Sequence, residues 1–258
     1  MNTLGRFLEF SVQAPDILES LRFYKSLGFT ELEIGDVWKY KYAVVSDGEL
    51  CIGLHEDLPD SPSLTFVHPD LARHARAMAD HGFEFVSLRL DEDVFNELAF
   101  ADRDGHMIRM LEARTFSPPI DEVGQSVCGE WFELVLPVRS AMRTGRFWAP
   151  LAPVLLRLRE EPTTHMRFDA EGAALGLSES IALEQPSLCF KCRDTDQLAS
   201  VVERHGVRHS TFPGFEGAFA ELEAPEGTKL YLFPEDFLGE SYVVEESGEY
   251  EAFSGNSA

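Results

Sequence analysis

The chain has 258 residues, enough for two domains of ordinary size, and its 45 acidic against 22 basic side chains give a net charge of −23. Because this charge repels phosphate backbones, we expect no nucleic-acid partner. No apolar run approaches the roughly 20 residues that a membrane span needs, and the N-terminus lacks a secretory signal pattern. We therefore expect a cytoplasmic protein with no membrane partner.

The first organised stretch reads as a strand followed by an amphipathic helix. Apolar and polar residues alternate over 6–13, which indicates a half-buried strand. Asp16 suits an N-cap, because its carboxylate can accept from free N–H groups of the first turn. Gly28 suits the left-handed position after a helix. The pattern predicts a strand over 6–13 and a helix over 16–27.

This pattern returns once, at a nearly constant spacing. Four landmarks are repeated at an offset of 124 residues and one at 122: Glu9 and Glu133 (133 − 9 = 124), Phe23 and Phe147 (147 − 23 = 124), Pro62 and Pro186 (186 − 62 = 124), Gly82 and Gly206 (206 − 82 = 124), Gly105 and Gly227 (227 − 105 = 122). Such self-similarity indicates tandem copies of one domain.

Each copy divides again into two units with the order β-α-β-β-β. We predict an α+β fold with modules over 6–56 and 62–113 in an N-terminal domain (1–113), and over 130–180 and 186–234 in a C-terminal domain (129–236). A linker rich in proline joins the domains over 114–128. The acidic stretch 237–258 is predicted to be a disordered tail.

Cys189 and Cys192 form a Cys-x-x-Cys, while Cys51 and Cys128 stand alone. The pair falls within an alternating strand, where residues three apart face opposite sides. No second pair of cysteines or histidines accompanies it. The sequence thus favours buried thiols over a zinc or redox motif.

Two segments of the first copy carry a family resemblance: FYKSLGF at the end of the first helix, and DRDGHMIRMLE at the last turn and strand. They resemble the glyoxalase, bleomycin-resistance and dioxygenase family, the vicinal oxygen chelate superfamily. The likeness covers about 6–113 and, more weakly, 130–234. It implies curled mixed sheets that form cups, in which family enzymes hold a divalent metal.

The resemblance also implies four metal-ligand positions in each copy. In the first copy they hold Glu9, Gly53, Ser63 and Arg109, and in the second Glu133, Gly176, Ser187 and Tyr231. Glycine offers no side-chain donor, and a guanidinium repels a cation. One carboxylate per copy does not hold a transition metal in a defined geometry. We therefore expect the scaffold without a metal cofactor.

The same positions supply candidates for binding an organic ligand. Alternation places Phe7 and Ser11 on the face of Glu9. The full set of cup-lining candidates is Glu9, Ser11, Ser63, Arg109, Trp131, Glu133, Ser187 and Tyr231. Aromatic residues on predicted cup faces, Trp38, Tyr40 and Tyr42 among them, suit either a flat ligand or core packing.

Arg109 is predicted to approach Glu9 or Glu133, depending on whether modules pair within or across copies, which the sequence leaves open. Such a pair either orients a ligand or is structural. His55 and His165, on strands, are either replacement metal ligands beside Glu9 and Glu133 or solvent-facing residues at strand ends.

The leading hypothesis is a metal-free protein that binds a small organic molecule in one or both cups. The first alternative is a divalent-metal-dependent lyase or dioxygenase with rearranged ligands. The second is a non-catalytic scaffold or partner-binding protein whose cups are packed shut. Two fused copies can satisfy within one chain the pairing that single-copy relatives reach as dimers, which favours a monomer and leaves a homodimer open.

Overall fold

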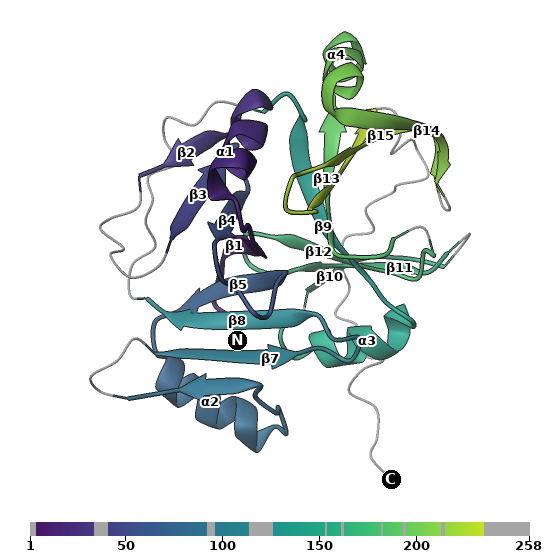
Figure 1. Ribbon diagram of the computed structural model, residues 1–258. Coiled ribbons are helices and arrows are strands. Elements are labelled where there is room, and N and C mark those ends of the chain that lie inside the picture. Colours follow the sequence, from purple (N-terminus) through teal and green to yellow (C-terminus); the bar gives the residue numbers. More distant parts are fainter. Residues whose placement is uncertain are drawn as a thin grey trace.

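The computed structural model describes residues 4–33, 41–91, 96–113, 126–152, 154–160, 163–181, 183–192, 195–212 and 215–234 (Figure 1). Most of the expected linker (114–125), the expected tail (237–258) and the aromatic residues Trp38 and Tyr40 lie outside these ranges.

The first copy forms one eight-stranded sheet with two helices. Its elements are β1 (Arg6–Gln13), α1 (Ile17–Ser26), β2 (Thr30–Leu32), β3 (Tyr42–Ser46), β4 (Cys51–His55), β5 (Ser63–His68), α2 (Leu71–Asp80), β6 (Ser87–Arg89), β7 (Glu97–Ala101) and β8 (Met107–Glu112). The strand order is β2-β3-β4-β1-β5-β8-β7-β6. The antiparallel pair β1–β5 joins the two modules.

The second copy repeats this topology. Its elements are β9 (Glu130–Pro137), α3 (Ala141–Trp148), β10 (Val154–Arg159), β11 (His165–Asp169), β12 (Ala174–Ser178), β13 (Ser187–Cys192), α4 (Thr195–His205), β14 (Gly206–Phe212), β15 (Phe215–Glu223) and β16 (Lys229–Pro234). The strand order is β10-β11-β12-β9-β13-β16-β15-β14. The α+β fold with two tandem domains is confirmed, and modules pair within a copy.

The local signals of the first helix explain its bounds. The Asp16 carboxylate accepts from the backbone N–H of Glu19 at 3.0 Å, as an N-cap does. Gly28 follows the helix with φ of +88°, a conformation that costs other residues free energy. Leu21 and Tyr24 are buried on the inner face of α1.

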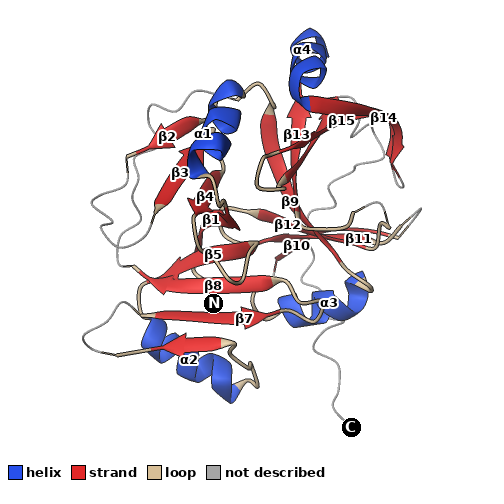
Figure 2. Cartoon of the chain, viewed as in Figure 1, coloured by secondary structure: helices blue, strands red, loops and turns tan. Residues whose placement is uncertain are grey.

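The two helix-bearing sheet faces share one core, and the helices at the junction are α1 and α3 (Figure 2). Buried apolar residues of both copies, from Leu4 to Leu232, belong to a single cluster. Phe7 and its repeat counterpart Trp131 stack across the junction with ring centroids 6.2 Å apart. The copies are therefore packed around equivalent residues.

Each copy also donates hydrogen bonds from its first helix to the last hairpin turn of the other copy. Glu226, in the turn before β16, accepts from the Ser20 hydroxyl and the Tyr24 hydroxyl, both at 2.6 Å. Ser20 corresponds to Thr144 (144 − 20 = 124) and Tyr24 to Trp148 (148 − 24 = 124).

In the reciprocal contact, the Thr144 hydroxyl donates to Asp104 and the Trp148 indole N–H donates to Asp102 at 3.2 Å. Both acceptors lie in the turn before β8. The same set of hydrogen bonds thus joins the two copies twice, once from each copy to the other. We call these contacts the clasp.

None of the helices among the described residues is long and apolar enough to cross a membrane.

The clasp predicts that both domains unfold together. Tyr24→Phe removes one donor from the Glu226 carboxylate, so we expect the free energy of unfolding to fall by about 1–3 kcal/mol. Urea denaturation measures this change.

In calorimetry, the wild-type protein should show one transition with equal calorimetric and van't Hoff enthalpies. Two separate transitions would contradict the shared core.

Asp102 should link stability to pH. Burial works to raise the pKa of Asp102, but hydrogen bonds and charge from His106 outweigh it and lower this pKa. A carboxyl whose pKa is lower in the folded state stabilises fully above its unfolded value of about 3.9, and loses this contribution as pH falls through the folded value.

We therefore expect Asp102→Asn to destabilise by about 1–3 kcal/mol at neutral pH and to lose less stability on acidification than the wild type. Urea titrations from neutral pH down to about pH 3 check this. Asp70→Asn, at the N-cap of α2 in an exposed ion pair with Arg73, is the control. An unchanged pH profile of Asp102→Asn would argue against the assignment.

Candidate functional site

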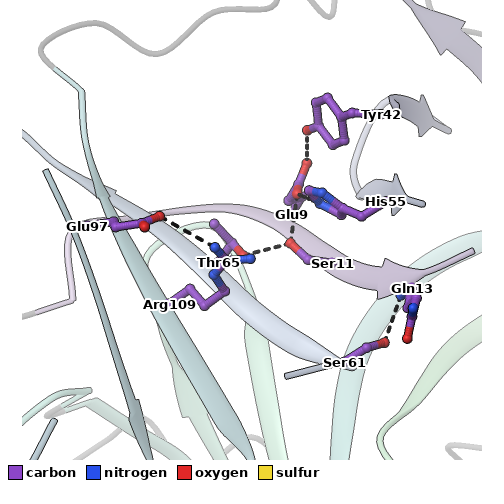
Figure 3. Close-up of polar contacts among 9 residues, drawn as sticks. All are labelled: Glu9, Ser11, Gln13, Tyr42, His55, Ser61, Thr65, Glu97 and Arg109. Carbon is purple, nitrogen blue, oxygen red and sulfur yellow. Dashed lines mark hydrogen bonds and ion pairs between the residues drawn. The ribbon is translucent and has the colours of Figure 1, made fainter. Parts of the chain in front are cut away.

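Glu9, in the middle of β1, is the centre of a buried polar cluster on the sheet face opposite α1 (Figure 3). We call this the N-terminal cup face; it carries Glu9, Ser11, Tyr42, His55, Ser63, Thr65, Glu97, Met107 and Arg109. Glu9 and Ser11 are almost fully buried. Such burial of a carboxylate requires hydrogen-bond donors around it.

Three side chains supply these donors. The Ser11 hydroxyl donates to Glu9 Oε1 at 2.7 Å, and His55 Nε2 lies 3.1 Å from the same oxygen. The Tyr42 hydroxyl donates to Glu9 Oε2. Burial, followed by the charge of Glu9, raises the pKa of Tyr42 well above its usual value, so Tyr42 keeps its proton.

The direction of the hydrogen bonds follows from these contacts. Ser11 has one proton and gives it to Glu9, so Thr65, whose hydroxyl lies 2.6 Å from Ser11 Oγ, is the donor in that contact. The hydrogen bonds therefore run in one direction, from Thr65 to Ser11 and from Ser11 to the Glu9 carboxylate.

A glycine makes room for this carboxylate. Gly53 lies on β4, next to β1, and a Cβ built at this position would lie 2.1 Å from Glu9 Oε1. A side chain here is incompatible with the observed Glu9 conformation. The space beside the glycine at an expected ligand position is thus filled by the side chain of Glu9 from the neighbouring strand.

The C-terminal domain repeats this arrangement. A Cβ at Gly176 would lie 2.6 Å from Glu133 Oε1, and His165 Nε2 lies 2.9 Å from the same oxygen. His165 occupies the repeat position of Tyr42 (165 − 42 = 123). Each glutamate therefore has a hydrogen-bond partner at the start of the second strand along the sheet: Tyr42 in β3 for Glu9, and His165 in β11 for Glu133.

The structure shows that His55 and His165 point inward. The side chain of His165 is buried and that of His55 is about one-fifth exposed, at 22%. The solvent-facing interpretation is therefore wrong for both.

The prediction of a contact between Arg109 and Glu9 or Glu133 is not realised among the described contacts. Arg109 lies beside Thr65 in the register of β5 and β8, and its ion-pair partner is Glu97, with Nη2 at 3.5 Å from Oε2. Arg89 reaches the other oxygen of Glu97 at 3.1 Å. Both contacts lie within the outer three strands of the sheet.

Two predicted cup residues lie on the other face. The strand register shifts by one residue between Phe7 and Glu9 in β1, and at the equivalent place in β9. A one-residue shift turns the following side chains to the opposite face. Phe7 and Trp131 therefore face the shared core, and the expectation that they line the cup with Glu9 and Glu133 is corrected.

The strand register places the remaining candidates, Ser63, Ser187 and Tyr231, on the cup faces. Ser63 is fully buried, and its hydroxyl has no hydrogen-bond partner among the described residues. Its counterpart Ser187 donates to the backbone carbonyl of Gln185 at 2.9 Å. Burial raises the pKa of Tyr231, at the position of Arg109, to about 12.

The C-terminal cup face also holds Glu133, His165 and Arg167, but it is apolar at positions where the N-terminal face carries hydroxyl groups. Its cluster comprises Val135, Leu183, Cys189, Phe219, Tyr231 and Phe233, with Phe132 packed against it. Val135 replaces Ser11 (135 − 11 = 124), and Cys189 replaces Thr65 (189 − 65 = 124). Aromatic rings therefore pack over this face.

Cys189 and Cys192 behave as the strand pattern predicts. Cys189 belongs to the C-terminal cup cluster, whereas Cys192 belongs to the shared core. All four cysteines are buried, and none of them forms a disulfide among the described residues.

A wide surface depression of about 840 Å³ lies beside β2, away from Glu9. Its lining residues are Lys25, Gly28, Phe29, Thr30, Glu31, Leu32 and Glu33. None of them belongs to the polar cluster, so we assign the candidate site by chemistry and burial.

The side chains present do not fit the metal implied by the resemblance. Within the described ranges, no group of three or more His, Cys, Asp and Glu side chains is placed to hold a metal ion. Each cup face brings together one carboxylate and one imidazole, Glu9 with His55 and Glu133 with His165. The weak metal candidates therefore meet only in pairs.

Sequence reasoning missed the roles of Tyr42, Thr65 and Glu97. The offset between Tyr42 and His165 (165 − 42 = 123) is one residue less than that between Glu9 and Glu133 (133 − 9 = 124), so the repeat pointed only approximately to their equivalence. Thr65 lies two residues after the candidate Ser63, on the same strand face.

Comparison with solved structures shows similarity to dioxygenases. A catechol 2,3-dioxygenase is 13% identical with a TM-score of 0.59, over 90% of this chain and 87% of that chain. The 2,3-dioxygenase LapB from Pseudomonas sp. KL28 is 14% identical with a TM-score of 0.58, over 91% and 93%.

The 2,2',3-trihydroxybiphenyl 1,2-dioxygenase from Sphingomonas wittichii strain RW1 is 16% identical with a TM-score of 0.55, over 90% of both chains. Neither a protein-family model nor a curated protein sequence matches the chain. At these identities the likeness shows the fold: two tandem domains of the vicinal oxygen chelate type.

The approach of Glu9 to Gly53 can be tested by a double-mutant cycle. Gly53→Ala should displace the Glu9 carboxylate and lower the free energy of unfolding by about 1–3 kcal/mol. In the Glu9→Ala background the same substitution should cost less, because the clash is with the Glu9 side chain. Urea denaturation of the four proteins measures the coupling. Equal costs in both backgrounds would contradict the close approach.

Proposed function

We propose that this chain is a metal-independent member of the vicinal oxygen chelate superfamily that binds a small organic molecule on its N-terminal cup face. Superfamily membership is supported by the tandem fold, by the dioxygenases of similar structure, and by the FYKSLGF and DRDGHMIRMLE segments. The observation that carries the binding proposal is the buried Ser63 hydroxyl without a partner.

Metal independence is supported by the donor set. Of the four expected ligand positions in the N-terminal copy, only Glu9 offers a carboxylate, and three side chains already donate to it. Gly53 cannot be replaced by a ligating residue without moving Glu9. We therefore propose that the protein binds its ligand without a metal cofactor.

Ligand binding is supported by the cost of the present arrangement. A buried hydroxyl without a partner destabilises a fold by about 1–3 kcal/mol, and buried polar groups are nearly always satisfied. The same position in the C-terminal copy is satisfied by Gln185. An external acceptor for Ser63 explains why the N-terminal copy keeps the hydroxyl.

The N-terminal face is the better candidate of the two. Its floor is lined by hydroxyl, imidazole, carboxylate and guanidinium groups, which give a ligand orientation. Beside Glu133, His165 and Arg167, the C-terminal face carries a cluster of aromatic and aliphatic side chains. We therefore propose that the C-terminal cup is closed and structural, as the scaffold alternative expected for both.

A thermal-shift screen tests the proposal. The full chain is stripped with EDTA, dialysed, and screened against aromatic, acidic and cationic small molecules. A ligand at 100 times its Kd should stabilise the protein by about 2.7 kcal/mol. Binding that appears only after Fe²⁺ or Mn²⁺ is restored would instead favour the metal-dependent lyase or dioxygenase.

Two serine variants separate ligand binding from folding. Ser63→Ala removes an unsatisfied hydroxyl, so we expect unchanged or higher stability of the free protein and at least about tenfold weaker binding of any screening hit. The matched control Ser187→Ala should cost about 1 kcal/mol of stability and leave affinity unchanged. Urea denaturation and calorimetry measure both. The reverse pattern would contradict the proposed site.

A further inference from the structure

Building on the proposed function, we infer that the ligand of the N-terminal cup face is a small organic anion, whose acidic group is bound by Arg109 and Ser63. The inference concerns the chemical class of the ligand and the end of the cup face that holds its charge.

Arg109 is incompletely used by its protein partner. Its bond to Glu97 has a length of 3.5 Å, at the upper limit for a hydrogen bond, and Glu97 is also held by Arg89 at 3.1 Å. Two guanidinium groups therefore share one carboxylate. Among the described residues, this leaves one positive charge in excess at the outer end of the cup face, in a chain with a net charge of −23.

The unpartnered hydroxyl of Ser63 lies next to this charge. On β5, Ser63 and Thr65 share the cup face, and Thr65 lies directly opposite Arg109 on β8. With strands about 4.8 Å apart and a rise of about 3.3 Å per residue, the Cα atoms of Ser63 and Arg109 are about 8 Å apart, a gap that an arginine side chain can span. A buried O–H donor and a guanidinium together match the acceptor oxygens of a carboxylate.

Glu9 determines which way the anion lies. Its carboxylate is held over Gly53 on β4, whereas Ser63 and Arg109 lie on β5 and β8, on the other side of β1. Like charges repel in a region of low dielectric. The acidic end of the ligand must therefore lie at Arg109, and its other end extends toward Tyr42 and His55.

The second copy serves as an internal control. In the second copy, Tyr231 stands at the position of Arg109. The Ser187 hydroxyl, at the position of Ser63, donates to the backbone carbonyl of Gln185. Neither a cation nor an unsatisfied hydroxyl is needed at these positions to form the domain. Arg109 and Ser63 are thus specific to the N-terminal copy, as expected of residues that bind a ligand.

Calorimetry with matched acid and amide probes tests the inference. The probes are benzoate, phenylacetate and 3-phenylpropionate, each compared with its neutral amide. We expect at least one acid to bind at least about tenfold more tightly than its amide. Arg109→Gln should abolish this preference, and Ser63→Ala should weaken binding of the acid.

Two further variants protect the test from effects of misfolding. Glu97→Gln releases Arg109 from its competing carboxylate, so affinity for the acid should increase severalfold, a gain that damage to the fold does not produce. Arg73→Gln, on an exposed residue of α2, lowers the net charge by one, as Arg109→Gln does, and should leave affinity unchanged.

The outcomes distinguish the inference from the proposed function. Amides that bind as tightly as acids, with no effect of Arg109→Gln, would overturn the inference and leave a neutral ligand on the same face. Failure of all three acids would also overturn the inference. The proposed function falls only if the broader screen of the metal-stripped protein finds no ligand.

Discussion

The close approach of a buried glutamate to a glycine on the neighbouring strand is the constraint on which both cup faces depend. Glu9 over Gly53 and Glu133 over Gly176 are the same contact, formed once in each copy. A carboxylate so deeply buried must be surrounded by donors, and this requirement explains why Tyr42 and His165 hold equivalent positions.

Around this constraint the two copies have diverged in opposite directions. The helix-bearing faces remained equivalent, because each copy clasps the other through its first helix and last hairpin turn. The cup faces take no part in that clasp and were free to change. One kept hydroxyl and guanidinium groups, and the other was filled with aromatic side chains. A shared core therefore supports two cup faces of different composition.

Much of the fold could be predicted from the sequence, because repeats and helix caps are local or regular signals. The offset of 124 residues predicted two copies, and Asp16 and Gly28 predicted the ends of the first helix. The face of Phe7 and Trp131 could not be predicted, because alternation assumes an unbroken strand and one extra residue reverses it.

The candidate site was predicted only in part, for a different reason. The ligand positions identified Glu9, Ser63 and Arg109 as residues of interest, but their partners come from other strands. Gly53 was interpreted as a lost ligand, whereas the structure shows that it gives space to Glu9. The contact between Arg109 and Glu97 could have been predicted, because the turn at Gly105 brings both residues onto the same face of the β7–β8 hairpin.

Metal content is the most direct measurement of the central claim, that Glu9 and its donors take the place of a metal centre. The full chain is purified without chelator, dialysed separately against Mn, Fe, Ni and Zn salts, desalted and analysed for bound metal. The account predicts less than about a tenth of an equivalent per chain, because neither cup face supplies a complete donor set. Close to one equivalent per chain, lost in Glu9→Ala or Glu133→Ala, would contradict it.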